Sequence, residues 1–148
     1  WGTSFKDCSF QNVEFRDCVF MACKFKNCNL TNAKFSYSTI VNTSLAGCHN
    51  IDISSGVNIY NVYPTCKISD DLEDALQNLK GNRNLKKTKL LFISDTKYNY
   101  LNLFLLQRRY GDYLPVLLYE LAIHSTEGIT TYRKLERVLN KLQTPAII

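Results

Sequence analysis

Large apolar side chains recur at every fifth position through the first third of the chain. The series runs without a slip through Phe5, Phe10, Phe15, Phe20, Phe25, Leu30, Phe35, Ile40 and Leu45. An α-helix repeats its apolar residues every three to four positions and a half-buried strand every two, so neither element produces this pattern. A fixed short period indicates a coiled repeat in which each unit buries its apolar residue against its stacked neighbours.

Two further positions share this period. Two residues before each large side chain the chain carries a small or compact one, namely Thr3, Cys8, Val13, Cys18, Cys23, Cys28, Ala33, Ser38, Thr43 and Cys48. Two residues after it stand turn-forming residues, namely Asp7, Asn12, Asp17, Asn27, Asn32 and Asn42, with Ala22, Tyr37 and Gly47 as departures. Each five-residue unit therefore predicts one short side and one corner.

These residues resemble the pentapeptide-repeat family, over residues 3 to about 52. The resemblance implies a right-handed, four-sided β-helix with four units per coil, in which the large and the small residue both point inward. The chain departs from the commonest family pattern just before the large residue, where Asp or Asn is usual and Ser9, Val19 or Lys24 stands here. We expect a column of roughly 12 Å with two open ends that need covers.

From residue 68 onward the sequence is Leu-rich and charged, with helical spacing. About four helices are predicted, over Asp70–Gly81, Asp95–Arg109, Tyr113–His124 and from Thr130 or Thr131 to Leu142. Asp70 with Glu73 has the spacing of a capping box. A polar loop is expected over residues 82–87, and a strand or a buried extended segment over residues 90–93.

The fold class is therefore predicted to be mixed β and α, in two domains. Residues 1–67 would form the β-helix with an irregular closing coil, and residues 68–148 a helical bundle that caps the stack. Because so short a stack would be marginally stable alone, the helices are expected to contribute to its stability.

The repeat register accounts for five of the six cysteines. Cys8, Cys28 and Cys48 lie twenty residues apart, so they would stack in coils of four units. We expect them to be buried apolar filler, although stacked neighbours would also be close enough for a disulfide. Cys66 lies outside the register and is the candidate exposed thiol.

Groups that could perform catalysis are scarce. In the repeat register Cys48 points inward and His49 outward, so they cannot share a proton. His124 is expected to interact with the last carbonyls of its helix. No glycine-rich phosphate loop and no zinc-binding spacing occurs. We therefore expect no catalytic residue, no metal and no cofactor.

The leading interpretation is a non-catalytic protein–protein interaction or scaffold module that uses the outer faces of the β-helix. The interaction candidates are Arg16, Met21, Lys24, Lys26, Lys34 and Tyr37. Met21 and Tyr37 stand out because they are bulky where the pattern prefers small polar residues. Ser36 is a further outward position. Self-association through the helical region stays open.

Charge and length bear on the partner. The 148 residues carry 18 Lys and Arg against 13 Asp and Glu, a net charge of +5 without dense clusters. This balance favours a protein partner over nucleic acid. No apolar run is long enough to cross a membrane. A cytoplasmic setting is favoured, in bacterial or host cytosol, and the glycosylation motifs at Asn29 and Asn42 keep a luminal or extracellular one open.

Three alternatives remain. Some pentapeptide-repeat proteins that protect DNA gyrase mimic duplex DNA, but this column is short and the chain is positively charged. Residues 117–142 resemble the opening of a helix-turn-helix, which would need a recognition helix after it. The chain could also be the substrate-recruiting part of a larger enzyme, such as a bacterial effector ubiquitin ligase.

Overall fold

The computed structural model describes residues 1–48, 51–53 and 56–144. The chain divides into two compact units, Trp1–Tyr63 and Pro64–Ile148. We call them the repeat column and the helical unit. Within the described residues, no helix is long and apolar enough to cross a membrane.

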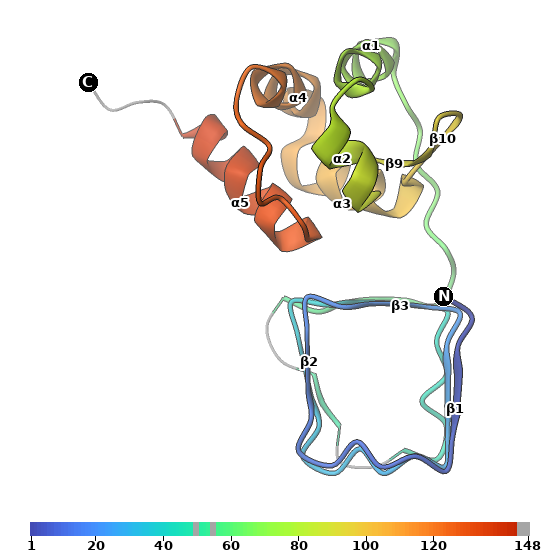
Figure 1. Cartoon of the computed structure of the whole chain (residues 1–148). Coiled ribbons are helices and arrows are strands. Elements are labelled where there is room, and N and C mark those ends of the chain that lie inside the picture. The colour runs from blue at the N-terminus through green and yellow to red at the C-terminus, as the bar shows by residue number, and fades with distance from the viewer. Residues whose placement is uncertain (49–50, 54–55, 145–148) are drawn as a thin grey trace. The chain divides into compact units, whose positions relative to one another are not determined.

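The repeat column is a four-sided coil of short parallel strands (Figure 1). Its strands are β1 Ser4–Lys6, β2 Glu14–Arg16, β3 Val19–Met21, β4 Lys24–Lys26, β5 Lys34–Ser36, β6 Thr39–Val41, β7 Asp52–Ile53 and β8 Asn58–Tyr60. The pairs β1–β4, β2–β5 and β3–β6 are parallel, and each residue faces the one twenty positions on, as Phe15 faces Phe35. A bridge between Ser9 and Asn29 marks the remaining side. Each coil therefore holds four five-residue units, as predicted.

The third layer is irregular, as the loss of the period after Leu45 predicts. β7 pairs with β5 and places Ile53 opposite Phe35, eighteen positions back. β8 pairs with β6 and places Ile59 opposite Ile40, nineteen positions back. The chain thus keeps the stacking direction while it shortens the turn.

The corners depend on residues in the left-handed backbone region. φ lies between 44° and 61° at the eight corner residues Asp7, Asn12, Asp17, Ala22, Asn27, Asn32, Tyr37 and Asn42. Asn and Asp tolerate this region better than other residues that carry a Cβ. Corner N–H groups donate to the coil above, from Asp7 to the carbonyl of Lys26 at 3.1 Å and from Asn12 to that of Thr31 at 3.0 Å. One position of the repeat thus sets both the bend and the register.

Phenylalanine rings fill the interior. Phe5 stacks on Phe25 with ring centroids 4.9 Å apart, and Phe15 on Phe35 at 4.8 Å. Rings on adjacent sides meet edge to face, as Phe15 and Phe20 do at 5.3 Å and 85°. Both geometries suit the quadrupoles of aromatic rings. Phe25 and Phe35, in the second coil, are fully buried.

The inward cysteines are more than apolar filler. All six cysteines of the chain are free. The thiol of Cys28 lies 3.5 Å from the carbonyl of Phe5, and that of Cys48 lies 3.4 Å from the carbonyl of Phe25. The hydroxyl of Ser38 donates in the same way to the carbonyl of Phe15 at 3.1 Å. The small inward residue therefore satisfies a carbonyl of the coil below, which the prediction of a purely apolar role missed.

The helical unit consists of α1 Asp70–Leu79, α2 Arg83–Thr88, β9 Phe92–Ser94, β10 Lys97–Tyr98, α3 Tyr100–Tyr110, a 3-10 turn Gly111–Tyr113, α4 Leu114–Ala122 and α5 Tyr132–Gln143. The four longer helices correspond to the four that were predicted. One hydrophobic core joins α1, α3, α4 and α5 through buried leucines, among them Leu72, Leu76, Leu103, Leu106, Leu117, Leu121, Leu135 and Leu139.

The predictions for two segments of this unit were wrong. The expected polar loop over residues 82–87 is mostly α2, because Asn82 accepts a hydrogen bond from the N–H of Leu85 at 3.1 Å and Leu85 is buried. The helix expected from Asp95 begins only at Tyr100, since β9 and β10 pair antiparallel before it. In the first case the cap at Asn82 decides the outcome, and in the second the pairing of β9 with β10 does.

Helix ends were predicted with mixed success. Thr131 caps α5 as expected, accepting from the N–H of Lys134 at 3.2 Å. His124 Nδ1 lies 2.7 Å from the carbonyl of Glu120 near the end of α4, also as expected. Ser69, not Asp70, caps α1 by accepting from the N–H of Leu72.

Cys66 was predicted to be an exposed thiol, and this prediction was wrong. Cys66 is half-buried against the helical core, and its Sγ donates to Gln107 Oε1 at 3.0 Å. Burial raises the pKa of this thiol. A raised pKa reduces the thiolate fraction and hence the reactivity of Cys66.

Phe35→Ala tests the stacked interior. Removing a fully buried ring that stacks on Phe15 should lower the free energy of unfolding by about 3–5 kcal/mol in urea denaturation. The control is Val62→Ala, at a side chain that is 76% exposed, which should change it by less than about 0.5 kcal/mol. Equal effects of the two substitutions would contradict the buried ladder.

Candidate interaction faces of the repeat column

Each side of the column presents its outward residues in stacked rows, because the positions just before and just after the large residue point away from the interior. The register of twenty residues places equivalent outward positions directly above one another. The chemistry of a face is therefore set by residues that are far apart in sequence.

The β2–β5–β7 side carries charges of both signs, and two of them form an ion pair. We call Glu14, Arg16, Lys34, Ser36 and Asp52 the mixed-charge face. Arg16 Nε lies 3.1 Å from Glu14 Oε1, and the hydroxyl of Ser36 donates to the same oxygen at 2.6 Å. Ser36 is buried rather than exposed, which corrects its prediction as an outward surface residue.

Glu14 is the electrostatic centre of this face. The hydrogen bond from Ser36 lowers the pKa of Glu14 most, followed by the hydrogen bond from Arg16. The positive charges of Arg16 and Lys34 lower the pKa further. The carboxylate is thus held ionised within a network that fixes the position of the Arg16 side chain.

Tyr37 covers the corner next to this face. Its ring is 41% exposed, and the guanidinium carbon of Arg16 lies 5.4 Å from the ring centroid, within cation–π range. A Cβ on Gly56, where φ is +77°, would come within 2.9 Å of the Tyr37 ring. A tyrosine therefore fits this corner because a glycine lies against it in the next coil.

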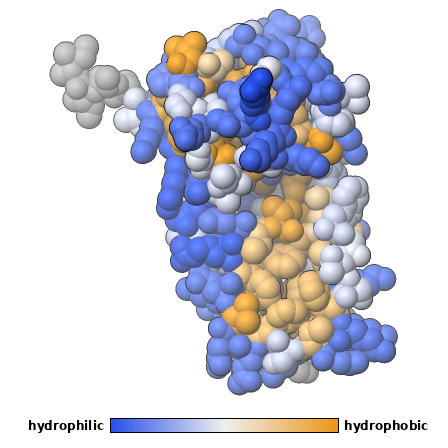
Figure 2. Space-filling model, viewed as in Figure 1, coloured by the Kyte–Doolittle hydropathy of each residue, from blue (hydrophilic) through white to orange (hydrophobic). Residues whose placement is uncertain are grey.

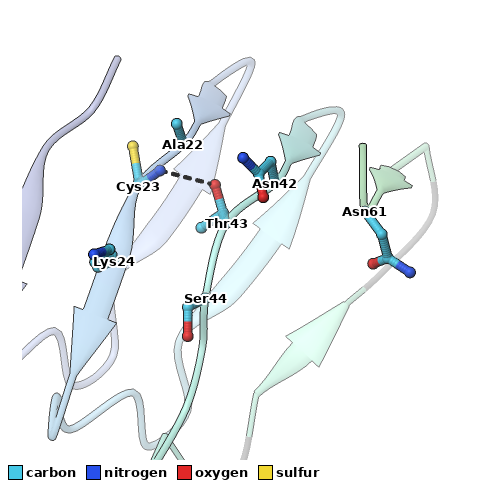
Figure 3. A pocket seen from close by; sticks show the side chains of 7 residues that line it. All are labelled: Ala22, Cys23, Lys24, Asn42, Thr43, Ser44 and Asn61. Carbon is cyan, nitrogen blue, oxygen red and sulfur yellow. Dashed lines mark hydrogen bonds between the residues drawn. The ribbon is translucent and has the colours of Figure 1, made fainter. Parts of the chain in front are cut away.

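The other two corner departures leave grooves. A groove of about 340 Å³ opens beside Ala22, lined also by Cys23, Lys24, Asn42, Thr43, Ser44 and Asn61 (Figure 3). In it the N–H of Cys23 donates to Thr43 Oγ1 at 3.2 Å. A groove of about 310 Å³ opens beside Gly47 and Asn27. Both lie where the corner lacks the usual Asn or Asp side chain.

The side formed by β1 and β4 carries only positive charge. We call Ser4, Lys6, Lys24, Lys26, Ser44 and Ala46 the lysine face. All six residues are exposed, and Lys6 stands directly opposite Lys26. Lys24 stands between Ser4 and Ser44. The two grooves lie along the two edges of this face, one at its entry corner and one at its exit corner.

The predicted candidates separate onto three sides of the column. Arg16, Lys34 and Tyr37 come together at the mixed-charge face and its corner. Lys24 and Lys26 belong to the lysine face. Met21 lies on the β3–β6–β8 side, opposite Val41, and is half-buried. The pairing of Lys6 with Lys26 was not predicted, although the twenty-residue register could have revealed it.

The first coil leaves its interior partly open. Figure 2 shows a broad apolar area over the open square of the column. Phe5, Phe10, Phe15 and Phe20 are half-buried there, and Val13 is 37% exposed. Within the described residues, β1, β2 and β3 each pair on one side only.

Within the part of the chain that the structure describes, no group of three or more His, Cys, Asp or Glu could hold a metal ion. His49 lies outside the described residues, so its orientation relative to Cys48 stays a prediction. The helix pair in residues 117–142 is joined by the nine residues 123–131, longer than the tight turn of a helix-turn-helix.

A family model described as pentapeptide repeats matches residues 1–36 and 14–49, with eight copies. The matched residues lie within the repeat column. No curated protein and no solved structure matches the chain.

The Glu14 network predicts a specific pH dependence. NMR titration should place the pKa of Glu14 below its ordinary value of 4.5, and Ser36→Ala should raise it. Because the folded-state pKa is lowered, the contribution of Glu14 to stability is present above its unfolded pKa and is lost as pH falls through the folded one. Ser44→Ala, on the lysine face, is the control and should leave the titration unchanged. A wild-type pKa at or above 4.5 would contradict the network.

Proposed function

Because residues 1–49 are a pentapeptide-repeat segment, we propose that the chain is a non-catalytic protein–protein interaction or scaffold module. The observation that supports this most is the division of one column into faces of different chemistry. The mixed-charge face contains an ion pair between Arg16 and Glu14, whereas the lysine face carries no acidic residue. Side chains at fixed spacing on a framework of stacked rings form a preorganised surface, which lowers the entropic cost of binding.

The corner at Tyr37 is the preferred contact site on this surface. Tyr and Arg are enriched among residues that dominate binding energy. Here the ring of Tyr37 lies beneath the guanidinium of Arg16, and the Glu14 carboxylate holds that guanidinium in place. A partner that covers this corner would bury an aromatic surface whose orientation is already set. Lys34 supplies a further positive charge beside it.

Several finer features stay predictions within this proposal. They are the right-handed sense of the coil, the cap that the helical unit would provide and self-association through that unit. Cytoplasmic localisation also stays a prediction.

A nucleic-acid role is the second candidate, and one observation favours it. The helix α5 presents Arg133, Lys134, Arg137 and Lys141, and Arg137 and Lys141 repeat at a spacing of one turn on an exposed surface. The length of the connection to α4 weighs against a helix-turn-helix, and the net charge of +5 weighs against DNA mimicry. Recruitment of substrates to a larger enzyme stays a prediction, and it would use the same contact surface.

The test is affinity capture by the full chain from its native source, followed by affinity measurement with the captured protein. The double variant Arg16→Gln with Tyr37→Asn should weaken binding at least about tenfold. The matched control, Arg83→Gln with Tyr119→Asn, changes the same residue types on exposed helical positions and should leave affinity unchanged. Capture that a nuclease abolishes would favour the nucleic-acid candidate, and equal affinity of both variants would remove the Tyr37 corner.

A further inference from the structure

We infer that the lysine face binds an acidic, extended peptide segment of a protein partner. This inference rests on the proposed interaction function and assigns a partner chemistry to a second face. It follows from the unneutralised charge of Lys6, Lys24 and Lys26, from their spacing and from the grooves beside them.

The fold places like charges opposite one another on the lysine face. Lys6 and Lys26 face each other across a parallel pair, at a strand spacing of about 4.8 Å. Like charges placed directly opposite in a sheet are destabilising. Within the described residues none of the three ammonium groups has an ion-pair or hydrogen-bond partner. Positive charge is therefore concentrated on this side without an anion to offset it.

The mixed-charge face shows that a side of this column can carry acidic residues beside its basic ones. It stands on the same column at the same strand spacing, yet its carboxylate at Glu14 pairs with Arg16 and lies near Lys34. The lysine face has Ser4, Ser44 and Ala46 at the positions where a carboxylate could stand. Asp7 occupies only the adjoining corner. The repeat can neutralise a face internally, and on this side it does not.

The spacing of the lysines matches that of side chains on an extended peptide. Lys24 and Lys26 are two residues apart on β4, so their side chains leave the same side of the strand at an interval of about 6.6 Å. An extended peptide presents alternate side chains at this same interval. Glutamates at alternate positions would meet both lysines in register, whereas glutamates in an unbroken block would direct half of their carboxylates away.

A groove lies at each end of the lysine face. A segment that runs along β4 would reach the groove beside Ala22 at one end and the groove beside Gly47 at the other. The amides of Asn42 and Asn61 lie in the first groove, and those of Asn27 and Asn29 in the second. Such amides can both donate to and accept from a peptide backbone.

The size of the face favours a peptide over a nucleic acid. Duplex DNA is bound through many phosphate contacts, and proteins that bind it well neutralise on the order of six to ten phosphates. The lysine face offers three lysines on strands of three residues each. Three charges at peptide spacing suit a short acidic segment.

The experiment uses fluorescence anisotropy with the full chain at low ionic strength. The probes are a short labelled peptide that alternates Glu and Ser, and a peptide of the same composition in which all Glu precede all Ser. Wild-type protein should bind the alternating peptide at least about threefold more tightly. The variant Lys6→Gln/Lys24→Gln/Lys26→Gln should weaken binding at least about tenfold. A labelled short DNA duplex serves as the competing probe.

The matched control is Lys67→Gln/Lys87→Gln/Lys97→Gln, which removes the same charge from exposed positions of the helical unit and should alter affinity by less than about twofold. Circular dichroism verifies that both variants fold. The inference is overturned if both variants bind alike, if neither peptide binds, if both peptides bind equally, or if the duplex binds more tightly than either. Native partner capture that survives the lysine variant while the peptide result is negative would overturn this inference alone and leave the proposed function standing.

Discussion

The stacking of the strands of the first coil on the strands twenty residues later is the interaction on which the rest of the repeat column depends. Left-handed corner residues such as Asp7 and Asn12 turn the chain and donate their N–H groups to the coil above. This fixes the register, and the register in turn places Phe15 on Phe35 and Phe5 on Phe25. Without the corners, the phenylalanines would have no common interior, and the outward residues would form no faces.

The same constraint explains the residues that break the pattern. An outward side chain contributes nothing to the buried ring stacks, and a corner side chain must only tolerate the left-handed backbone region, so both positions accept departures from the pattern. Ala22 and Gly47 leave grooves, whereas Tyr37 fills a corner against Gly56 and supports Arg16. The positions that depart from the repeat pattern are thus the ones that give the column its grooves and its exposed aromatic corner.

The sequence was sufficient to predict the repeat column, but it did not predict the side-chain contacts on the surface of the column. A strict period in Phe5 to Leu45 is sufficient to predict a coiled repeat, because the same physical environment repeats at each unit. The four units per coil were implied by the resemblance to the pentapeptide-repeat family. The hydrogen bond of Ser36 to Glu14 and the stacking of Arg16 on Tyr37 depend on side-chain orientation, which spacing does not encode. In the helical unit, long apolar stripes predicted the four longer helices. The short helix α2 was missed because its stability comes from one cap and one buried leucine.

The register itself is the central claim, and through-hydrogen-bond NMR couplings test it most directly. The structure predicts a coupling between the amide nitrogen of Asp7 and the carbonyl carbon of Lys26, and between those of Ala22 and Val41, each nineteen positions on. Couplings from these corner amides to carbonyls at any other separation would contradict the four-unit coil, and with it the assignment of residues to faces.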